Sequence, residues 1–178
     1  MTKHKRWMVA GAAVAGMALA LPALAQMRAD LPQEERGLYL GGGVGANDES
    51  ESVWRLFGGY RAHRNLAVEL GYIDLGEMSI NGRAANGEAW ELVALGIAPL
   101  GERFALYGKL GGYRGEARGG GITETRNDLT FGFGGQYDVG RNLGVRLEWQ
   151  RYTDFGGGAF GGVGDQDVIS VNAIYRFR

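Results

Sequence analysis

From residue 37 onward, apolar and polar side chains alternate along the chain with a period of two. Successive side chains of a β-strand point to opposite faces, so each alternating stretch of about ten residues predicts a strand with one apolar face. None of these stretches has the apolar spacing of an amphipathic helix. The predicted strands are Gly37–Gly45, Val53–Arg61, Leu66–Leu75, Glu88–Ala98, Phe104–Arg114, Leu129–Asp138, Leu143–Tyr152 and Val168–Arg178.

The connections between these strands alternate between short and long. The short ones are Ala62–Asn65, Pro99–Arg103 and Val139–Asn142, and the long ones are Ala46–Ser52, Gly76–Gly87, Gly115–Asp128 and Thr153–Asp167. This alternation predicts an up-and-down antiparallel barrel with unlike ends, a turn end and a loop end. Transmembrane barrels of the outer membrane have this asymmetry, with short periplasmic turns, longer extracellular loops and even strand numbers from eight upward.

The aromatic residues of the apolar face indicate whether that face is inside or outside the barrel. Trp54, Tyr72, Trp90 and Trp149 lie near the loop end, whereas Tyr60, Phe104, Tyr137, Tyr175 and Phe177 lie near the turn end. Aliphatic residues such as Leu56, Leu92 and Leu147 lie between the two groups. Two aromatic girdles around an aliphatic band match the two interfaces of a bilayer. We therefore expect an all-β fold, an eight-stranded antiparallel up-and-down transmembrane barrel whose apolar face contacts lipid.

The opposite, polar face must then line the lumen. Its charged residues are Arg55, Glu69, Glu91, Lys109, Arg146 and Glu148, accompanied by Gln136 and by Gly71, Gly111, Gly132 and Gly134. An eight-stranded barrel is just wide enough inside for side chains to fill it, so we expect the glycines to make room for the long charged side chains. Because unpaired buried charges are costly, Glu69 and Glu148 should neutralise some of the three cations. The pattern favours a polar plug and leaves a transport path open as the alternative.

The first residues predict an export signal. The basic residues Lys3, Lys5 and Arg6 precede an apolar run that closes with Ala23-Leu24-Ala25, the small-x-small pattern of a signal-peptidase site. We predict a cleaved signal peptide at residues 1–25, cut between Ala25 and Gln26, a flexible tail at 26–36 and a barrel domain at 37–178. The alternative is a retained anchor, but a membrane-spanning helix needs about 20 apolar residues and this run is shorter.

The composition of the chain excludes several other classes of protein. The chain of 178 residues fits one domain, and its mean hydropathy of −0.18 is low for a helical membrane protein. The absence of Cys excludes disulfides and thiolate metal sites. The net charge of −1 gives no electrostatic reason to bind nucleic acid.

The residues for catalysis are poorly placed. Barrels that modify lipid A need a Ser activated by a base such as His near the outer rim. His4 belongs to the predicted signal peptide and His63 to a predicted turn, whereas Ser50, Ser52 and Ser79 lie near the opposite end. We therefore expect no enzyme, no catalytic residue, no metal and no cofactor.

Several segments resemble the strands of OmpA-like transmembrane barrels, in the same order along the chain. They are Leu56–Arg61 and Asn65–Gly76 for the second and third strands, Tyr107–Gly112 for the fifth, Gly144–Gln150 for the seventh and Val168–Phe177 for the last. The resemblance implies a barrel in the outer membrane of a Gram-negative-type bacterium, inserted by the barrel-assembly machinery. The outward face of the last strand, with Ala173, Tyr175 and Phe177, would be the recognition signal, although Arg178 follows where family members commonly end on the aromatic residue.

The resemblance also implies an interior ion pair between Glu69 and Arg146. The family's acid on the sixth strand is replaced by Gln136, and its interior Lys on the fourth strand corresponds to Ala94, so the network is expected to be rearranged. We expect no peptidoglycan-binding domain after residue 178, so the cell-wall tethering of the family is not expected of this chain.

Three functions follow from these patterns. The leading hypothesis is a structural or surface-interaction protein of the envelope, a monomer that contacts outer-membrane lipid and lipopolysaccharide and binds an extracellular ligand at its loops. Arg118 and Arg126 in the third long connection, together with Arg114 just before it, are candidates for binding lipopolysaccharide phosphate, since Arg pairs bidentately with phosphate. The alternative is a narrow pore for ions or small solutes through the polar lumen. A lipid A-modifying enzyme is disfavoured.

Overall fold

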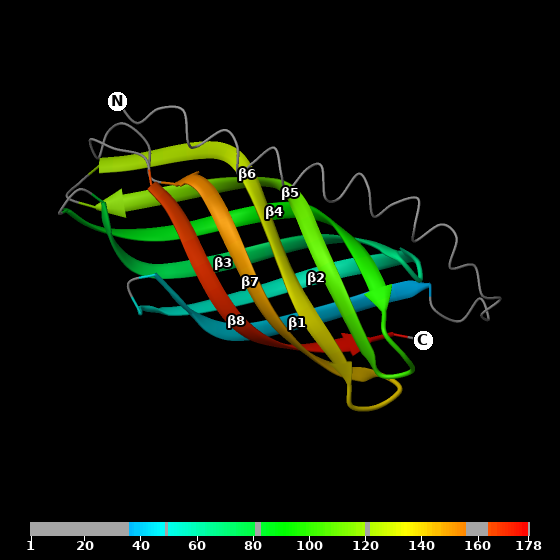
Figure 1. The fold of residues 1–178 in the computed structure, drawn as a ribbon. Helices are drawn as coiled ribbons and strands as arrows, with labels where there is room; N and C mark the ends of the chain where they lie inside the picture. The colour runs from blue at the N-terminus through cyan, green and yellow to red at the C-terminus, as the bar shows by residue number, and fades with distance from the viewer. Residues whose placement is uncertain (1–35, 49, 81–82, 120–121, 156–163, 178) are drawn as a thin grey trace, which may run out of the picture. The chain divides into compact units, whose positions relative to one another are not determined.

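The computed structural model describes residues 36–48, 50–80, 83–119, 122–155 and 164–177, which form a closed antiparallel β-barrel (Figure 1). Each strand pairs with its neighbours in sequence, and β1 pairs with β8 to close the barrel. The strands are β1 (Gly37–Asn47), β2 (Ser52–His63), β3 (Leu66–Ile80), β4 (Arg83–Pro99), β5 (Phe104–Gly119), β6 (Ile122–Asp138), β7 (Leu143–Phe155) and β8 (Gly164–Arg176). Within the described residues, no helix has the length and apolar character needed to cross a membrane. The signal peptide predicted for residues 1–25 lies outside the described residues and stays a prediction.

The predicted fold class, strand number and strand order are confirmed, but two of the expected loops are wrong. The connections expected at Gly76–Gly87 and Gly115–Asp128 are largely strand, because β3 and β4 pair as far as Ile80↔Arg83 and β5 and β6 as far as Gly119↔Ile122. The period-two pattern requires one apolar face. Above the lipid-facing band the outward face of these strands no longer contacts lipid, so the pattern fades although the backbone ladder continues.

Short connections hold the turn end together. The residues between strands are Arg64–Asn65, Leu100–Arg103 and Val139–Asn142. Two asparagines fasten these turns to neighbouring strands, since the amide of Asn65 donates to the carbonyl of Ile97 at 2.9 Å and that of Asn142 to the carbonyl of Arg176 at 2.8 Å. Figure 1 shows the β4–β5 and β6–β7 turns at the same end of the barrel as the end of β8.

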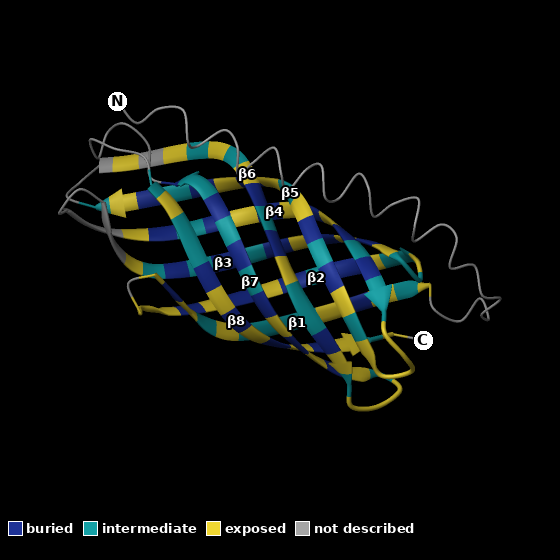
Figure 2. Ribbon diagram, viewed as in Figure 1, coloured by how far each residue is buried: buried dark blue, intermediate teal, exposed yellow. Residues whose placement is uncertain are grey.

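Buried and exposed residues alternate along the strands (Figure 2). The exposed side chains of the strands form an apolar surface too large to be stable in water. Val44, for example, is 67% exposed and Leu147 is 59% exposed. The aromatic residues near the loop end also point outward and contact one another, with ring centroids 5.5 Å apart for Trp54 and Tyr72 and 5.2 Å for Tyr72 and Trp90. Near the turn end the exposed aromatics are Tyr60, Phe104, Tyr137, Tyr175 and Phe177. Two aromatic belts therefore border an aliphatic surface.

Candidate functional site: the lumen and the loop end

Four charged side chains of alternating sign meet in the half of the lumen nearer the loop end, which we call the upper half. Arg55 of β2 lies between Glu91 of β4, whose Oε1 is 2.5 Å from Nη2, and Glu148 of β7, which pairs with Nη1. Lys109 of β5 reaches Glu148 at 2.8 Å and Glu91 at 3.5 Å. All four residues are at most 3% exposed. This upper ion cluster carries no net charge, which removes the largest cost of burying ions.

Neutral side chains donate further hydrogen bonds to the two carboxylates. The hydroxyl of Tyr152 and the amide of Gln150 donate to Oε2 of Glu91 at 2.7 and 2.6 Å, and the hydroxyl of Tyr107 donates to Oε2 of Glu148 at 2.7 Å. Sequence reasoning missed these donors. Tyr107 lies two residues before Lys109 in β5, and Tyr152 lies four residues after Glu148 in β7, so strand parity alone could have placed both in the lumen.

A second ion pair lies nearer the turn end. Nη1 of Arg146 is 2.5 Å from Oε1 of Glu69, and the hydroxyl of Tyr39 donates to the same oxygen at 2.7 Å. Nε of Arg146 donates to Oε1 of Gln136 at 3.0 Å. The Arg146 guanidinium also lies 5.0 Å from the ring centroid of Tyr107, which suits a cation–π contact. These contacts define the lower ion cluster, and Gln136 supplies an acceptor in it.

One comparison drawn from the family pattern is wrong. Ala94 was expected to occupy the position of an interior Lys, but it is exposed on the outward face and pairs with Val68 and Leu110, which are also exposed. The luminal positions of this part of β4 are Val93 and Leu95, because side chains one residue apart in a strand face opposite sides.

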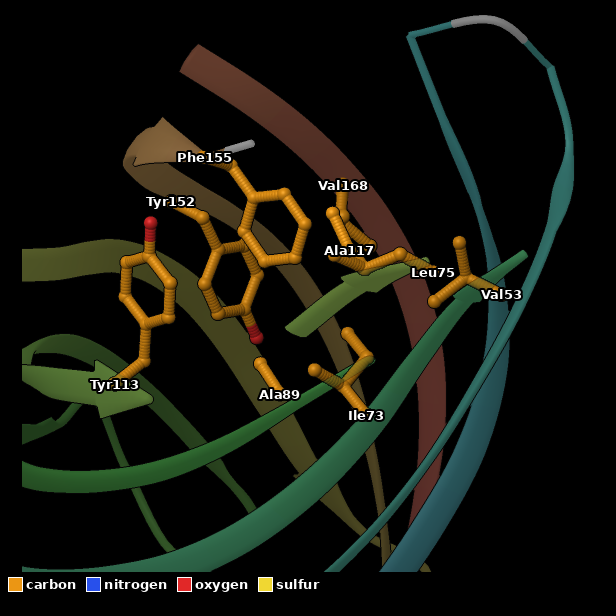
Figure 3. Close-up of a cluster of buried hydrophobic side chains, with 9 residues drawn as sticks. All are labelled: Val53, Ile73, Leu75, Ala89, Tyr113, Ala117, Tyr152, Phe155 and Val168. Atoms are coloured by element: carbon orange, nitrogen blue, oxygen red, sulfur yellow. The ribbon is translucent and has the colours of Figure 1, made fainter. Parts of the chain in front are cut away.

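Apolar side chains close the lumen at the loop end (Figure 3). Tyr152 is fully buried, and its ring packs edge-on against Tyr113 with centroids 5.2 Å apart. We call this group the apolar cap, and its members are Val53, Ile73, Leu75, Ala89, Tyr113, Ala117, Tyr152, Phe155 and Val168. A second buried cluster toward the turn end contains Tyr39, Phe57, Ala67, Val93, Leu95, Ile97, Tyr107 and Ile174. The polar plug that was expected therefore describes only part of the lumen, because an apolar cap lies on the loop side of the ions and the second apolar cluster packs around Arg146 of the lower ion cluster.

The luminal glycines accommodate aromatic rings as well as charged groups. A Cβ on Gly71 would lie 3.0 Å from Oε1 of Glu91, consistent with the expected role. A Cβ on Gly134 would lie only 2.6 Å from the hydroxyl oxygen of Tyr107, so the absence of a side chain at this position makes room for the end of the Tyr107 side chain beside β6. From that position Tyr107 reaches Glu148.

A cavity of about 140 Å³ opens the turn end of the lumen as far as the lower ion cluster. Tyr39, Arg61 and Arg146 line it together with Asp138 and Arg176, which form an ion pair with each other. Solvent on the turn side therefore comes near Arg146, whereas the apolar cap lies on the other side of both ion clusters.

The predicted phosphate-binding arginines have different surroundings. Arg118 pairs with Glu88 at 2.9 Å and also with Glu116, both acidic neighbours on the outer wall. Arg114 is exposed on the same face of β5, whereas Arg126 is half-buried on β6. The structure does not bring the three arginines together.

The residues weighed for catalysis lie at opposite ends. His63 ends β2 at the turn end and is exposed, whereas Ser52 begins the same strand at the loop end and Ser50 precedes it. In the parts of the chain that the structure describes, no group of three or more His, Cys, Asp or Glu is arranged to hold a metal ion.

An eight-stranded barrel with an apolar exterior, aromatic belts and an interior of paired ions is a transmembrane barrel of the bacterial outer membrane. The family model of the OmpA-like transmembrane domain matches residues 27–178, and the chain belongs to this family.

Curated relatives agree with this assignment. Outer membrane protein A of Klebsiella pneumoniae is 30% identical over 136 residues, which cover 68% of this chain and 40% of that protein. The corresponding protein of Klebsiella aerogenes is 31% identical over 143 residues, covering 75% and 41%. The chain thus spans about two fifths of the length of these relatives.

Solved structures show the same fold at low sequence identity. Neisserial surface protein A covers 79% of this chain and 97% of its own, with a TM-score of 0.59 and 14% identity. The N-terminal barrel of Pseudomonas aeruginosa OprF covers 80% and 98%, with a TM-score of 0.59 and 11% identity. Ail of Yersinia pestis, in complex with the heparin analogue sucrose octasulfate, covers 80% and 97%, with a TM-score of 0.54 and 18% identity.

Proposed function

We propose that the barrel has a structural and surface-interaction role in the outer membrane, with a closed lumen and a loop end that binds partners outside the cell. The observation that carries the proposal is the wall that β3–β6 form above the loop-end aromatic residues. The β3–β4 ladder continues from Tyr72↔Trp90 to Ile80↔Arg83. At about 3.3 Å per residue, the seven steps from Trp90 to Arg83 extend β4 by about 23 Å along the strand.

Among the described residues, the β6 edge of this wall has no pairing partner along part of its length. β6 pairs with β5 up to Ile122, but its pairing with β7 begins only at Thr130↔Tyr152. Among the described residues, no strand pairs with the other side of Thr123–Asn127. An unpaired edge of this kind can add an extended segment of another protein through main-chain hydrogen bonds.

The charge of the loop end indicates the kind of partner. Acidic residues predominate there, among them Asp48, Glu77 and Asp165. Their negative charge would repel a polyanion. Ail was solved with a heparin analogue, but the acidic loop end of this chain favours a basic or neutral protein surface.

Shortening the β5–β6 hairpin tests the proposal. Excision of residues 116–125, with an Asn-Gly turn that joins the register partners Gly115 and Arg126, removes most of this edge and leaves only Arg126 and Asn127 of it. The matched control shortens β3–β4 between Met78 and Ala85, also a register pair, and leaves the β6 edge in place. Adhesion of cells that display equal amounts of each barrel is then measured on wells coated with fibronectin, laminin or collagen.

We expect the wild-type barrel and the β3–β4 control to support adhesion and the β5–β6 variant to lose it. The proposal fails if cells with the wild-type barrel adhere no better on any of these surfaces than cells without it. Equal adhesion of all three barrels would equally exclude the β6 edge.

A narrow pore is the second candidate, and the turn-end cavity that reaches Arg146 favours it. The ions beyond Arg146 are paired, however, and the apolar cap lies between them and the loop end. A continuous aqueous path would have to cross this cap, so the closed lumen is the better-supported proposal.

We infer no enzymatic role for the barrel. The outer membrane enzyme PagL has a similar fold, with a TM-score of 0.50 and 14% identity, but a likeness at this level concerns the fold alone. His63 and Ser52 stand at opposite ends of β2 and cannot form a nucleophile–base pair. Overexpression should leave the mass spectrum of lipid A unchanged, and a new lipid A species would contradict the inference.

A further inference from the structure

Charged side chains outside the lumen differ in sign between the two ends of the barrel. At the loop end, acidic residues outnumber basic ones. At the turn end the described residues include only two acids, Glu102 and Asp138. The arginines of the turn end are Arg36, Arg61, Arg64, Arg103, Arg141 and Arg176. The turn end is therefore strongly basic although the chain as a whole carries a net charge of −1.

Two turns combine an exposed arginine with an exposed aliphatic residue. The β4–β5 turn contains Leu100, 59% exposed, and Arg103, and the β6–β7 turn contains Val139, 55% exposed, and Arg141. Neither arginine forms an ion pair with any residue that the structure describes. The remaining turn is similar in sequence, since Arg64 lies two residues before the exposed Leu66.

The aliphatic residues place these turns at the membrane surface. Phe104 begins β5 directly after the β4–β5 turn, and Tyr137 lies one residue before the end of β6 and the β6–β7 turn. Both rings are exposed at the level of the turn-end aromatic belt. Aromatic residues of such belts lie at the height of the lipid headgroups. An apolar side chain beside them enters the acyl boundary, and a neighbouring guanidinium then lies at the height of the lipid phosphates.

We propose that the turn end binds the phosphate groups of anionic phospholipids in the periplasmic leaflet, principally through Arg103 and Arg141. Short turns of outer-membrane barrels face the periplasm, and guanidinium groups bind phosphate through two parallel hydrogen bonds. Asp138 does not neutralise these arginines, because it pairs with Arg176 and accepts a hydrogen bond from Gln136 at 2.9 Å. The inference rests on the membrane placement of the barrel and not on its surface-interaction role.

The chain offers two matched positions for reporting local lipid composition. It contains no Cys, so a single introduced thiol can be labelled uniquely. A Cβ on Gly140 in the β6–β7 turn, or on Gly164 at the loop end of β8, would meet no atom within 4 Å. Gly140→Cys and Gly164→Cys therefore attach a donor dye to opposite ends with little disturbance of the fold.

The experiment measures energy transfer from each dye to acyl-labelled phosphatidylglycerol or acyl-labelled phosphatidylcholine in phosphatidylcholine vesicles. Because the acceptor lipid is present in both leaflets, the comparison does not depend on how the barrel is oriented. We expect the Gly140→Cys dye to report enrichment of phosphatidylglycerol by about fivefold for each engaged arginine, and the Gly164→Cys dye to report none. In about 1 M salt the enrichment should fall sharply, because exposed charges are screened.

Two double variants in the Gly140→Cys background identify the groups responsible. Arg103→Gln with Arg141→Gln should abolish the preference, whereas Arg114→Gln with Arg118→Gln removes the same charge at the loop end and should preserve it. The proposal is overturned if the Gly140→Cys dye reports equal transfer to both lipids, if the preference survives loss of Arg103 and Arg141, or if the Gly164→Cys dye reports the same enrichment.

Discussion

Arg146 is the residue on which the lower ion cluster depends, since it is the ion-pair partner of Glu69 and also holds Gln136. Arg146→Met leaves the Glu69 carboxylate buried without a counter-ion. Removing one member of a buried pair typically costs about 3–5 kcal/mol, and we expect the free energy of unfolding to fall by that amount. Urea unfolding in lipid vesicles, followed by tryptophan fluorescence, measures the change.

The double variant Glu69→Gln with Arg146→Met separates charge from packing, because it removes both ions. It should recover most of the stability lost in Arg146→Met. Arg118→Gln is the exposed control, since its ion pairs lie on the outer wall and such pairs contribute about 0–1 kcal/mol. A double variant as unstable as the single one would show that packing of the Arg146 side chain, and not its charge, supports the cluster.

Each strand is predictable from sequence only where lipid covers one of its faces. β1 and β2 extend at most two residues beyond either end of their predicted ranges, because nearly all of their length lies in the alternating region. β6 begins seven residues before its predicted start at Leu129, since Ile122–Asp128 has no apolar side to mark it. The ladder with β5, not the hydrophobic pattern, keeps this segment in a strand.

The two halves of β6 should consequently differ in protection from hydrogen exchange. Residues 130–137 pair on both sides within the barrel wall, whereas residues 123–127 pair only with β5 among the described residues. We expect the amides of 123–127 to exchange faster, because local opening there breaks one ladder instead of two. Amide exchange of the folded protein in nanodiscs, followed by mass spectrometry, resolves the two segments. Equal protection would mean that another part of the chain covers the edge.

At the scale of the whole molecule, the lumen was only partly predictable. Strand parity placed Arg55, Lys109 and Glu148 on one face, and charge balance indicated that they pair. The residues of the apolar cap occupy luminal positions of the same strands, as Val53 does two residues before Arg55. They were not recognised as luminal because the luminal face was expected to be polar. Which carboxylate meets which cation depends on the register around the closed barrel, and a pattern read along single strands does not contain that information.

The layering of the lumen predicts that the folded barrel does not conduct. Ions entering from the turn end reach Arg146 but then meet the paired charges of the upper ion cluster and, beyond them, the buried rings of Tyr113 and Tyr152. Single-channel recording on refolded protein, with folding verified by a gel shift between boiled and unboiled samples, should show no discrete steps. Reproducible steps that change in Arg146→Met would instead establish a pore through the lumen, and the closed barrel would have to be abandoned. Steps that Arg146→Met leaves unaltered would place the conducting path outside the lower ion cluster.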